Sequence, residues 1–176
     1  MERVVERGSQ EASEVIGAAA LAGKYMTFQL AQEVYGLRIL SVREIIGLME
    51  ITRLPRAPEF LRGVINLRGR VIPVIDLRLK FGLPAIAATE QTVIIVVQVE
   101  VGGRPLTMGV LVDLVLEVLT IDGSQIEPPP DLGGAAVDAR FILGVGKAGQ
   151  HVVFLLDIAQ ILESTDGTRL HQAASA

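Results

Sequence analysis

Two blocks of this sequence occur twice, and this duplication constrains the fold more than any other feature of the chain. Residues 36–45 match residues 109–118 at the first glycine, at the valine six residues on and at the glutamate eight residues on. Residues 63–77 resemble residues 144–158, with 13 residues from the glycine to the aspartate in both (63 to 76, 144 to 157). The blocks keep the same order, with offsets of 73 (36 to 109) and 81 (63 to 144) residues. We therefore expect two similar subdomains.

The expected subdomains are small. At about 70 residues, neither would bury much surface alone, so we expect them to share a hydrophobic core or to exchange elements. Half of the 176 residues are apolar and 20% are charged, which is ample material for a core. We expect a flexible leader at residues 1–23, a paired unit at 24–163 and a tail at 164–176. The paired unit would divide into about 24–88 and 89–163, with exchange of elements allowed.

Short runs rich in β-branched residues fill the paired unit and are separated by turn signals. Because there are five Phe, two Tyr and no Trp, Val, Ile and Leu must supply most of the packing, which favours strands. Many short strands joined by tight turns are typical of sandwiches and barrels, so the expected fold is all-β. Strands are predicted at residues 25–30, 34–38, 44–52, 64–67, 71–75, 92–101, 106–119 and 152–156.

Turn and cap residues mark the places where strands end. Three short helices are predicted, at residues 58–62, 77–81 and 158–164. Gly63 can end the first helix in a left-handed conformation, and Asp76 and Asp157 can cap the other two. Asn66 and Gly69 predict a tight turn, because glycine adopts positive φ and asparagine bonds its own backbone.

Side chains suited to catalysis or metal binding are scarce. The chain has no cysteine and two histidines, so a disulfide framework and a thiolate metal site are both excluded. His151 falls at a predicted turn and His171 in the tail, without carboxylates at ligand spacing. Asp76 and Asp157 could be read as an acid–base pair, but their equivalent places before helices are explained by capping. No glycine-rich loop has the spacing of a phosphate cradle. We expect a protein that is not an enzyme, with no catalytic residue, metal or cofactor.

Charge is distributed unevenly along the chain, which carries a formal net charge of −4. Residues 53–80 hold seven basic side chains against two acidic ones, whereas residues 90–163 hold ten acidic against three basic. Such asymmetry suits docking between proteins. The basic stretch lacks interleaved aromatic residues, so nucleic-acid binding is not expected. No secretory signal or membrane-spanning run of about 20 apolar residues is present, which predicts a cytoplasmic protein with no membrane insertion.

Two segments resemble the CheW family. Residues 35–45 are similar to its Y-G-hydrophobic-x-hydrophobic-x-x-V-x-E-I signature, and residues 61–78 are similar to its G-V-x-N-L-R-G block followed by P-hydrophobic-hydrophobic-D-L-R. The likeness covers about residues 24–163. It implies two SH3-like five-stranded β-barrels with a hydrophobic core between them and a few short helices. It also implies a cytoplasmic adaptor, associated with membrane receptor arrays, that couples chemoreceptor tips to the regulatory domain of the histidine kinase CheA.

The resemblance also implies two sets of binding residues. Val42, Ile51 and Val71 match positions that contact the kinase. Four further residues match positions linked to receptor binding: Glu44, Ile45, Arg68 and Val118. For a single valine, packing in the core remains the alternative. For Arg68, bracing of the two barrels remains open beside contact with an acidic receptor group.

Two other functions remain as alternatives to chemotaxis coupling. A hydrolase or transferase on a β scaffold is disfavoured by the lack of a catalytic cluster. A scaffold of the same family in a twitching, gliding or other non-flagellar chemosensory pathway would have the same sequence pattern.

Overall fold

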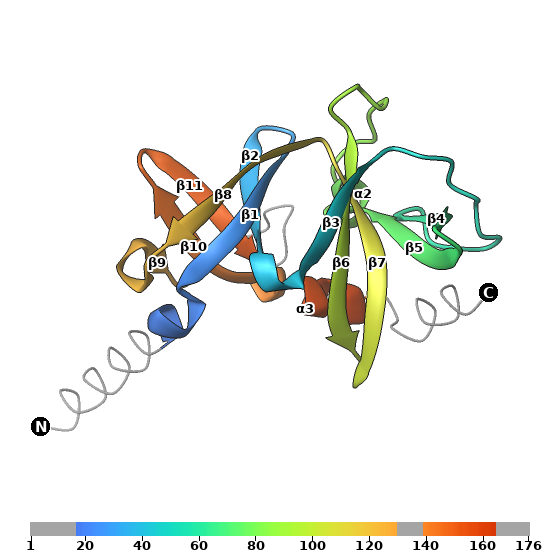
Figure 1. The fold of residues 1–176 in the computed structure, drawn as a ribbon. Coiled ribbons are helices and arrows are strands. Elements are labelled where there is room, and N and C mark those ends of the chain that lie inside the picture. Colours follow the sequence, from blue (N-terminus) through green and yellow to red (C-terminus); the bar gives the residue numbers. More distant parts are fainter. Residues whose placement is uncertain (1–16, 130–138, 165–176) are drawn as a thin grey trace, which may run out of the picture.

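The computed structural model describes residues 17–129 and 139–164, and in these ranges the strands form two sheets (Figure 1). The first sheet has the strand order β8-β1-β2-β11-β10-β9 and the second has the order β3-β6-β7-β5-β4. The expected all-β fold is confirmed, although the first sheet gains a sixth, two-residue strand, β9. Most of the expected leader and tail lies outside the described residues.

The bounds of the elements follow the chain. The first sheet contains β1 (Gly23–Leu30), β2 (Glu33–Arg38), β8 (Leu114–Ile121), β9 (Ile126–Glu127), β10 (Ile142–Ala148) and β11 (His151–Leu156). The second contains β3 (Val42–Gly47), β4 (Leu61–Leu67), β5 (Arg70–Asp76), β6 (Val93–Val101) and β7 (Arg104–Val112). The helical elements are α2 (Leu77–Lys80), α3 (Ile158–Glu163) and the 3-10 turns η1 (Ile39–Ser41), η2 (Gly123–Gln125) and η3 (Ala139–Phe141).

The two copies of the repeat exchange hairpins. The β1–β2 hairpin of the first copy pairs with strands β8 and β11 of the second, and the β6–β7 hairpin of the second copy pairs with β3 and β5 of the first. Each exchanged hairpin joins its sheet through one parallel pair of strands, and the two pairs have the same register. Gly36 lies opposite Leu155 and the equivalent Gly109 lies opposite the equivalent Val74. A division near residue 88 therefore does not separate the sheets. The second sheet is built from residues 42–112, and the first from the segments on either side.

Each sheet closes in the same way. After β3 the chain returns at Thr52, which forms an isolated antiparallel bridge with Val64 of β4, an edge strand of the second sheet. After β8 the chain returns as β9, in which Glu127 lies opposite Val145 of β10. Val64 and Val145 are equivalent in the repeat (64 plus 81), so the duplication extends to the strand that closes each barrel.

Three of the local predictions were wrong. The expected strand at 106–119 is two strands, β7 and β8, separated at Asp113, and the strand expected at 44–52 ends at Gly47. The helix expected at 58–62 is a turn that leads into β4. Tertiary pairing prevents that helix, because the carbonyl of Phe60 accepts a hydrogen bond from the Asp76 N–H at 2.8 Å at the end of β5.

One hydrophobic core spans the two sheets, as expected. It joins Phe28 and Tyr35 of the first sheet to Ile75 and Phe81, which belong to or follow the second. The Tyr35 ring lies 5.9 Å from that of Phe28 and 5.6 Å from that of Phe81, between ring centroids. Burial raises the pKa of Tyr35 to about 12. The tyrosine therefore acts as a packed, neutral core residue between the sheets.

Candidate functional site

Residues suited to metal binding or catalysis do not gather in the part of the chain that the structure describes. In residues 17–129 and 139–164 there is no group of three His, Cys, Asp or Glu side chains that could hold a metal. His151 is exposed at the start of β11, and His171 lies outside the described residues. Asp76 accepts a hydrogen bond from Leu79 N at 3.4 Å at the start of α2, and Asp157 accepts one from Gln160 N at 3.2 Å at the start of α3.

No helix in the described ranges is long and apolar enough to cross a membrane.

The turn between β4 and β5 holds the predicted Arg68. The side-chain oxygen of Asn66 accepts a hydrogen bond from the Gly69 N–H at 2.9 Å, and both turn residues have positive φ, 51° at Arg68 and 86° at Gly69. The Arg68 guanidinium forms an ion pair with the Glu44 carboxylate of β3. Glu44 lies on a strand of the second sheet and Arg68 on a turn between two others, so this contact closes one barrel and does not brace the two together.

Two of the predicted receptor positions are exposed apolar residues on edge strands. Ile45 on β3 is 40% exposed and Val118 on β8 is 46% exposed. They are equivalent in the repeat (45 plus 73 is 118). Ile45 lies opposite Ile95 of β6 and Val118 lies opposite Met26 of β1, and both partner strands belong to exchanged hairpins. Exposed aliphatic side chains on a strand edge are suited to protein contacts, because burial in a complex removes them from water.

The three predicted kinase positions lie in the second sheet at intermediate burial. Val42 begins β3, Ile51 precedes the Thr52 bridge and Val71 lies on β5 opposite Asn66. The first two pack against the shared core, whereas Val71 is not among the residues packed there. Val42 lies on one edge strand of the sheet and Val71 lies next to the other edge strand, so the structure places the three positions in one barrel.

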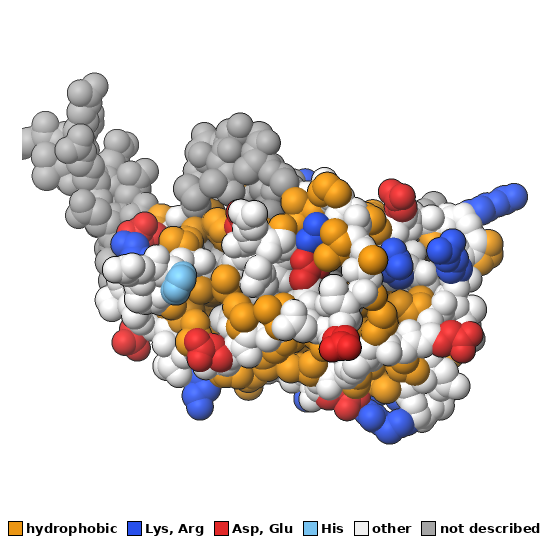
Figure 2. Space-filling model, turned by 90° about the horizontal axis from the view of Figure 1, so that it is seen from above, with side chains coloured by type: hydrophobic (Ala, Val, Ile, Leu, Met, Phe, Trp, Pro, Cys, Tyr) orange, Lys and Arg blue, Asp and Glu red, His pale blue; other side chains and the backbone are white. Residues whose placement is uncertain are grey.

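Taken together, six of the seven predicted positions lie between residues 42 and 112, and Val118 alone lies in the first sheet. Figure 2 shows basic side chains gathered at the end of the molecule where Figure 1 places β4 and β5. Acidic and apolar side chains are spread over the rest of that face.

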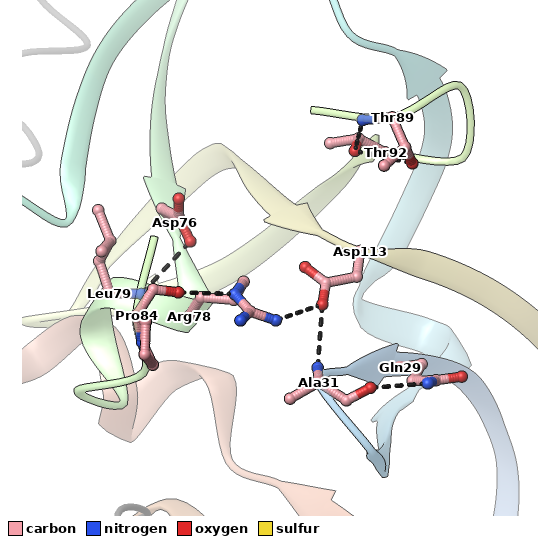
Figure 3. Close-up of polar contacts among 9 residues, drawn as sticks. All are labelled: Gln29, Ala31, Asp76, Arg78, Leu79, Pro84, Thr89, Thr92 and Asp113. Atoms are coloured by element: carbon pink, nitrogen blue, oxygen red, sulfur yellow. Dashed lines mark hydrogen bonds and ion pairs between the residues drawn. The ribbon is translucent and has the colours of Figure 1, made fainter. Parts of the chain in front are cut away.

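The sequence reasoning missed a polar network at the chain's return from the second sheet to the first (Figure 3). Asp113 lies between β7 and β8, and its Oδ2 accepts hydrogen bonds from Arg78 Nη1 at 2.6 Å and from Ala31 N at 2.9 Å. Arg78 Nε also donates to the Pro84 carbonyl at 3.0 Å. An aspartate inside the apolar run 106–119 was the available signal, since a buried carboxylate requires a partner.

Two further features were not predicted. Leu40, in η1 between the sheets, is 89% exposed, the largest value among the described large hydrophobic residues. A hollow of about 950 Å³ opens at the far end of the first sheet, lined by residues including Leu21, Ile126, Pro128 and Leu143. None of the predicted binding positions lines it.

Comparison with known proteins gives consistent results. Residues 24–166 match the family model described as CheW-like domain. The chemotaxis protein CheW of Klebsiella aerogenes is 36% identical over 158 residues, which cover 90% of this chain and 89% of the relative. CheW of Rhizobium meliloti is 33% identical over 141 residues, covering 80% of this chain and 88% of the relative. The crystal structure of the scaffolding protein TtCheW from Thermoanaerobacter tengcongensis superposes with a TM-score of 0.71 at 38% identity, covering 81% of this chain and 89% of the other.

Proposed function

Because the chain belongs to the CheW family, we propose that it couples chemoreceptors to the histidine kinase CheA by binding both proteins directly. It is a scaffold of chemotaxis signal transduction and not an enzyme. The observation that carries the proposal is the family match over residues 24–166, which includes both sheets. The adaptor transmits the receptor signal through contacts alone, by biasing the kinase between its states.

The kinase and the receptor contact two different sets of residues. The kinase regulatory domain contacts the second sheet at Val42, Ile51 and Val71. The receptor tip contacts the two equivalent edge strands, at Ile45 on β3 and at Val118 on β8. This division is supported by exposure: Ile45 and Val118 are exposed, whereas Val42, Ile51 and Val71 are only partly exposed.

Glu44 and Arg68 serve the receptor surface as a pair. Their ion pair fixes the β4–β5 turn against β3, next to Ile45. An exposed pair of this kind contributes little to stability, about 0 to 1 kcal/mol, so holding a binding surface in shape is the role that its position favours.

The adaptor acts in the cytoplasm, at the receptor arrays. Neither sheet needs a lipid contact for the two proposed surfaces to work. Cell fractionation tests this placement: the protein should sediment with membranes when receptors are present and stay in the supernatant when they are absent.

The kinase surface is tested by titration against the purified CheA regulatory domain. Val71→Asp should weaken binding at least about tenfold, because an unpaired charge would enter an apolar contact. Val42→Asp should do the same, but Val42 packs against the core, so its fold must be checked by thermal unfolding. The matched control is Val152→Asp, at the equivalent position of β11 (71 plus 81), where the valine is 49% exposed.

Normal binding by a folded Val71→Asp protein would disprove the kinase assignment. An equal loss for Val152→Asp would show that the effect is not specific to the second sheet. If the unaltered chain binds neither the kinase domain nor a receptor-tip fragment, the coupling function itself is wrong.

A further inference from the structure

Glu44 and Glu117 occupy equivalent positions in the two sheets, and their backbones are held alike. The pairing of β3 with β6 shifts register between Val42 and Glu44. The pairing of β8 with β1 shifts register between Val115 and Val118, which lie opposite Phe28 and Met26. Each glutamate therefore lies at a bulge in an edge strand. In the first sheet the Thr27 hydroxyl accepts a hydrogen bond from Glu117 N at 3.1 Å and donates one to the Glu117 carbonyl.

The two carboxylates differ in their partners. Glu44 is paired with Arg68, from the turn between β4 and β5. The equivalent turn, between β10 and β11, has Gly149 at that place (68 plus 81), with φ 63° against 51° at Arg68. The lysine of that hairpin, Lys147, is paired with Glu127. Among the described residues, no basic side chain lies within ion-pair distance of the Glu117 carboxylate.

The surroundings of Glu117 are apolar and exposed. Leu116 is 43% exposed and Val118 is 46% exposed, and both flank Glu117 on β8, an edge strand of the first sheet. A partner that packs against the edge of β8 would exclude water from the Glu117 carboxylate, which strengthens a charge-assisted contact. The backbone hydrogen bonds to Thr27 hold the strand in place, so little ordering is needed on binding.

We propose that Glu117 receives a basic side chain in trans from the receptor tip, completing between two proteins the ion pair that Arg68 and Glu44 form within one. The partner surface presents a guanidinium flanked by apolar side chains that cover Leu116 and Val118. Arginine fits better than lysine, because its planar fork can engage both carboxylate oxygens. The inference rests on the proposed function, since the neighbouring Val118 is one of the proposed receptor positions.

The test is a titration of the chain with a receptor-tip fragment and, separately, with the kinase regulatory domain. Glu117→Arg should weaken receptor binding by more than about tenfold and leave kinase binding within about twofold. Glu117→Gln should weaken receptor binding less and flatten its dependence on salt, because one ionic contact is lost. Glu100→Arg, which makes the same charge change at an exposed residue of β6, is the matched control and should have no effect on either.

An arginine introduced in this chain near Glu117 offers a second test, which leaves Glu117 unchanged. Gly149→Arg rebuilds the Arg68 arrangement in the first sheet, so it should compete with the partner and weaken receptor binding by about fivefold to tenfold. Gly149→Asn should leave receptor binding unchanged, because asparagine also tolerates positive φ but carries no charge.

Each outcome separates the inference from the proposed function. If Glu117→Arg binds the receptor as the unaltered chain does, or if Glu100→Arg weakens it equally, the trans ion pair is wrong and the coupling function stands. If the unaltered chain itself fails to bind the receptor tip, the proposed function fails first.

Discussion

At the chain's passage from the first sheet to the second, Leu40 leaves 89% of its surface exposed, whereas at the return passage Asp113 is tied to Arg78 at 2.6 Å. The two positions are equivalent in the repeat (40 plus 73 is 113). One passage therefore presents an apolar side chain to the surroundings, and the other holds the sheets together through a mostly buried ion pair. The repeat therefore accepts an exposed apolar residue at one crossing and a paired carboxylate at the other.

Charge separates the two sheets in a similar way. Several residues of the second sheet and of the helix after it are arginines. The residues at the equivalent positions of the other repeat are neutral or weakly basic. The pairs are Arg43 and Leu116, Arg62 and Leu143, Arg68 and Gly149, Arg70 and His151, and Arg78 and Ala159. Since the first sheet folds without these arginines, the fold does not need them all. Arg78 is used by the crossing, and Arg62 and Arg68 pair with Asp76 and Glu44. The charges of Arg43 and Arg70 are available for partners.

The largest expected effect concerns closure of the two barrels. A Cβ atom on Gly63 would lie 2.0 Å from the Thr52 carbonyl oxygen, at a φ of 143°. On the equivalent Gly144 it would lie 3.0 Å from the Glu127 carbonyl oxygen. Gly63→Ala should therefore lower the free energy of unfolding by about 3 kcal/mol or more, and Gly144→Ala by about 1 to 2 kcal/mol. Urea unfolding of both variants measures the difference, and equal losses would show that the two barrels close with the same tightness.

The second prediction concerns the two crossings. Asp113→Ala would leave the Arg78 guanidinium without its ion partner, and the Arg78 side chain is only 11% exposed. We expect a loss of about 2 to 4 kcal/mol in the free energy of unfolding, whereas Leu40→Ser should change it by less than about 0.5 kcal/mol. Chemical denaturation checks both values. A double variant, Arg78→Ala with Asp113→Ala, should lose less than the sum of the single changes; strict additivity would mean that the pair is not coupled.

Much of this fold was predictable because the repeat, the β-branched runs and the caps are local signals. Asp76 and Asp157 start helices where the sequence places them, and the shared core follows from the size of each half. Which hairpin joins which sheet was not predictable, since Gly36 and Gly109 carry the same local pattern in both copies. The exchange is visible only in the structure, where Gly36 pairs with Leu155 of the other repeat and Gly109 pairs with Val74 of the other repeat.

The candidate site was less accessible to sequence reasoning. The family likeness points to Ile45, Val118 and Arg68 as receptor positions but does not predict which side chain Arg68 contacts within the chain. Its ion pair with Glu44 depends on closure of the barrel, which brings β3 next to the β4–β5 turn over a distance of 24 residues in the chain. Glu117 has no basic partner among the described residues, and this becomes informative only once the equivalent turn is known to hold Gly149 in place of Arg68.

A smaller effect is expected at those two turns. Arg68 adopts a left-handed φ that costs a side-chain-bearing residue about 1 to 2 kcal/mol, and its exposed ion pair returns at most about 1 kcal/mol. Arg68→Gly should therefore change the free energy of unfolding by no more than about 1 kcal/mol in either direction, while Gly149→Ala should lower it by about 1 kcal/mol. Thermal unfolding, run beside receptor binding, tests the comparison. A loss of several kcal/mol for Arg68→Gly would mean that the residue supports the barrel and not the partner surface.

The smallest effect is the pH dependence contributed by the Asp76 cap. Burial raises the pKa of Asp76 above its ordinary value of 3.8, and the Leu79 N–H and the Arg62 guanidinium oppose part of that rise. Between 3.8 and the raised pKa the folded protein holds more protons than the unfolded chain, so the free energy of unfolding should fall as pH rises through that window. Asp76→Asn keeps a capping side chain and should remove this decline in urea unfolding measured from about pH 3 to about pH 7. Asp157→Asn makes the same exchange at the α3 cap of the other repeat, and an equal change in its curve would show that burial of Asp76 is not the cause.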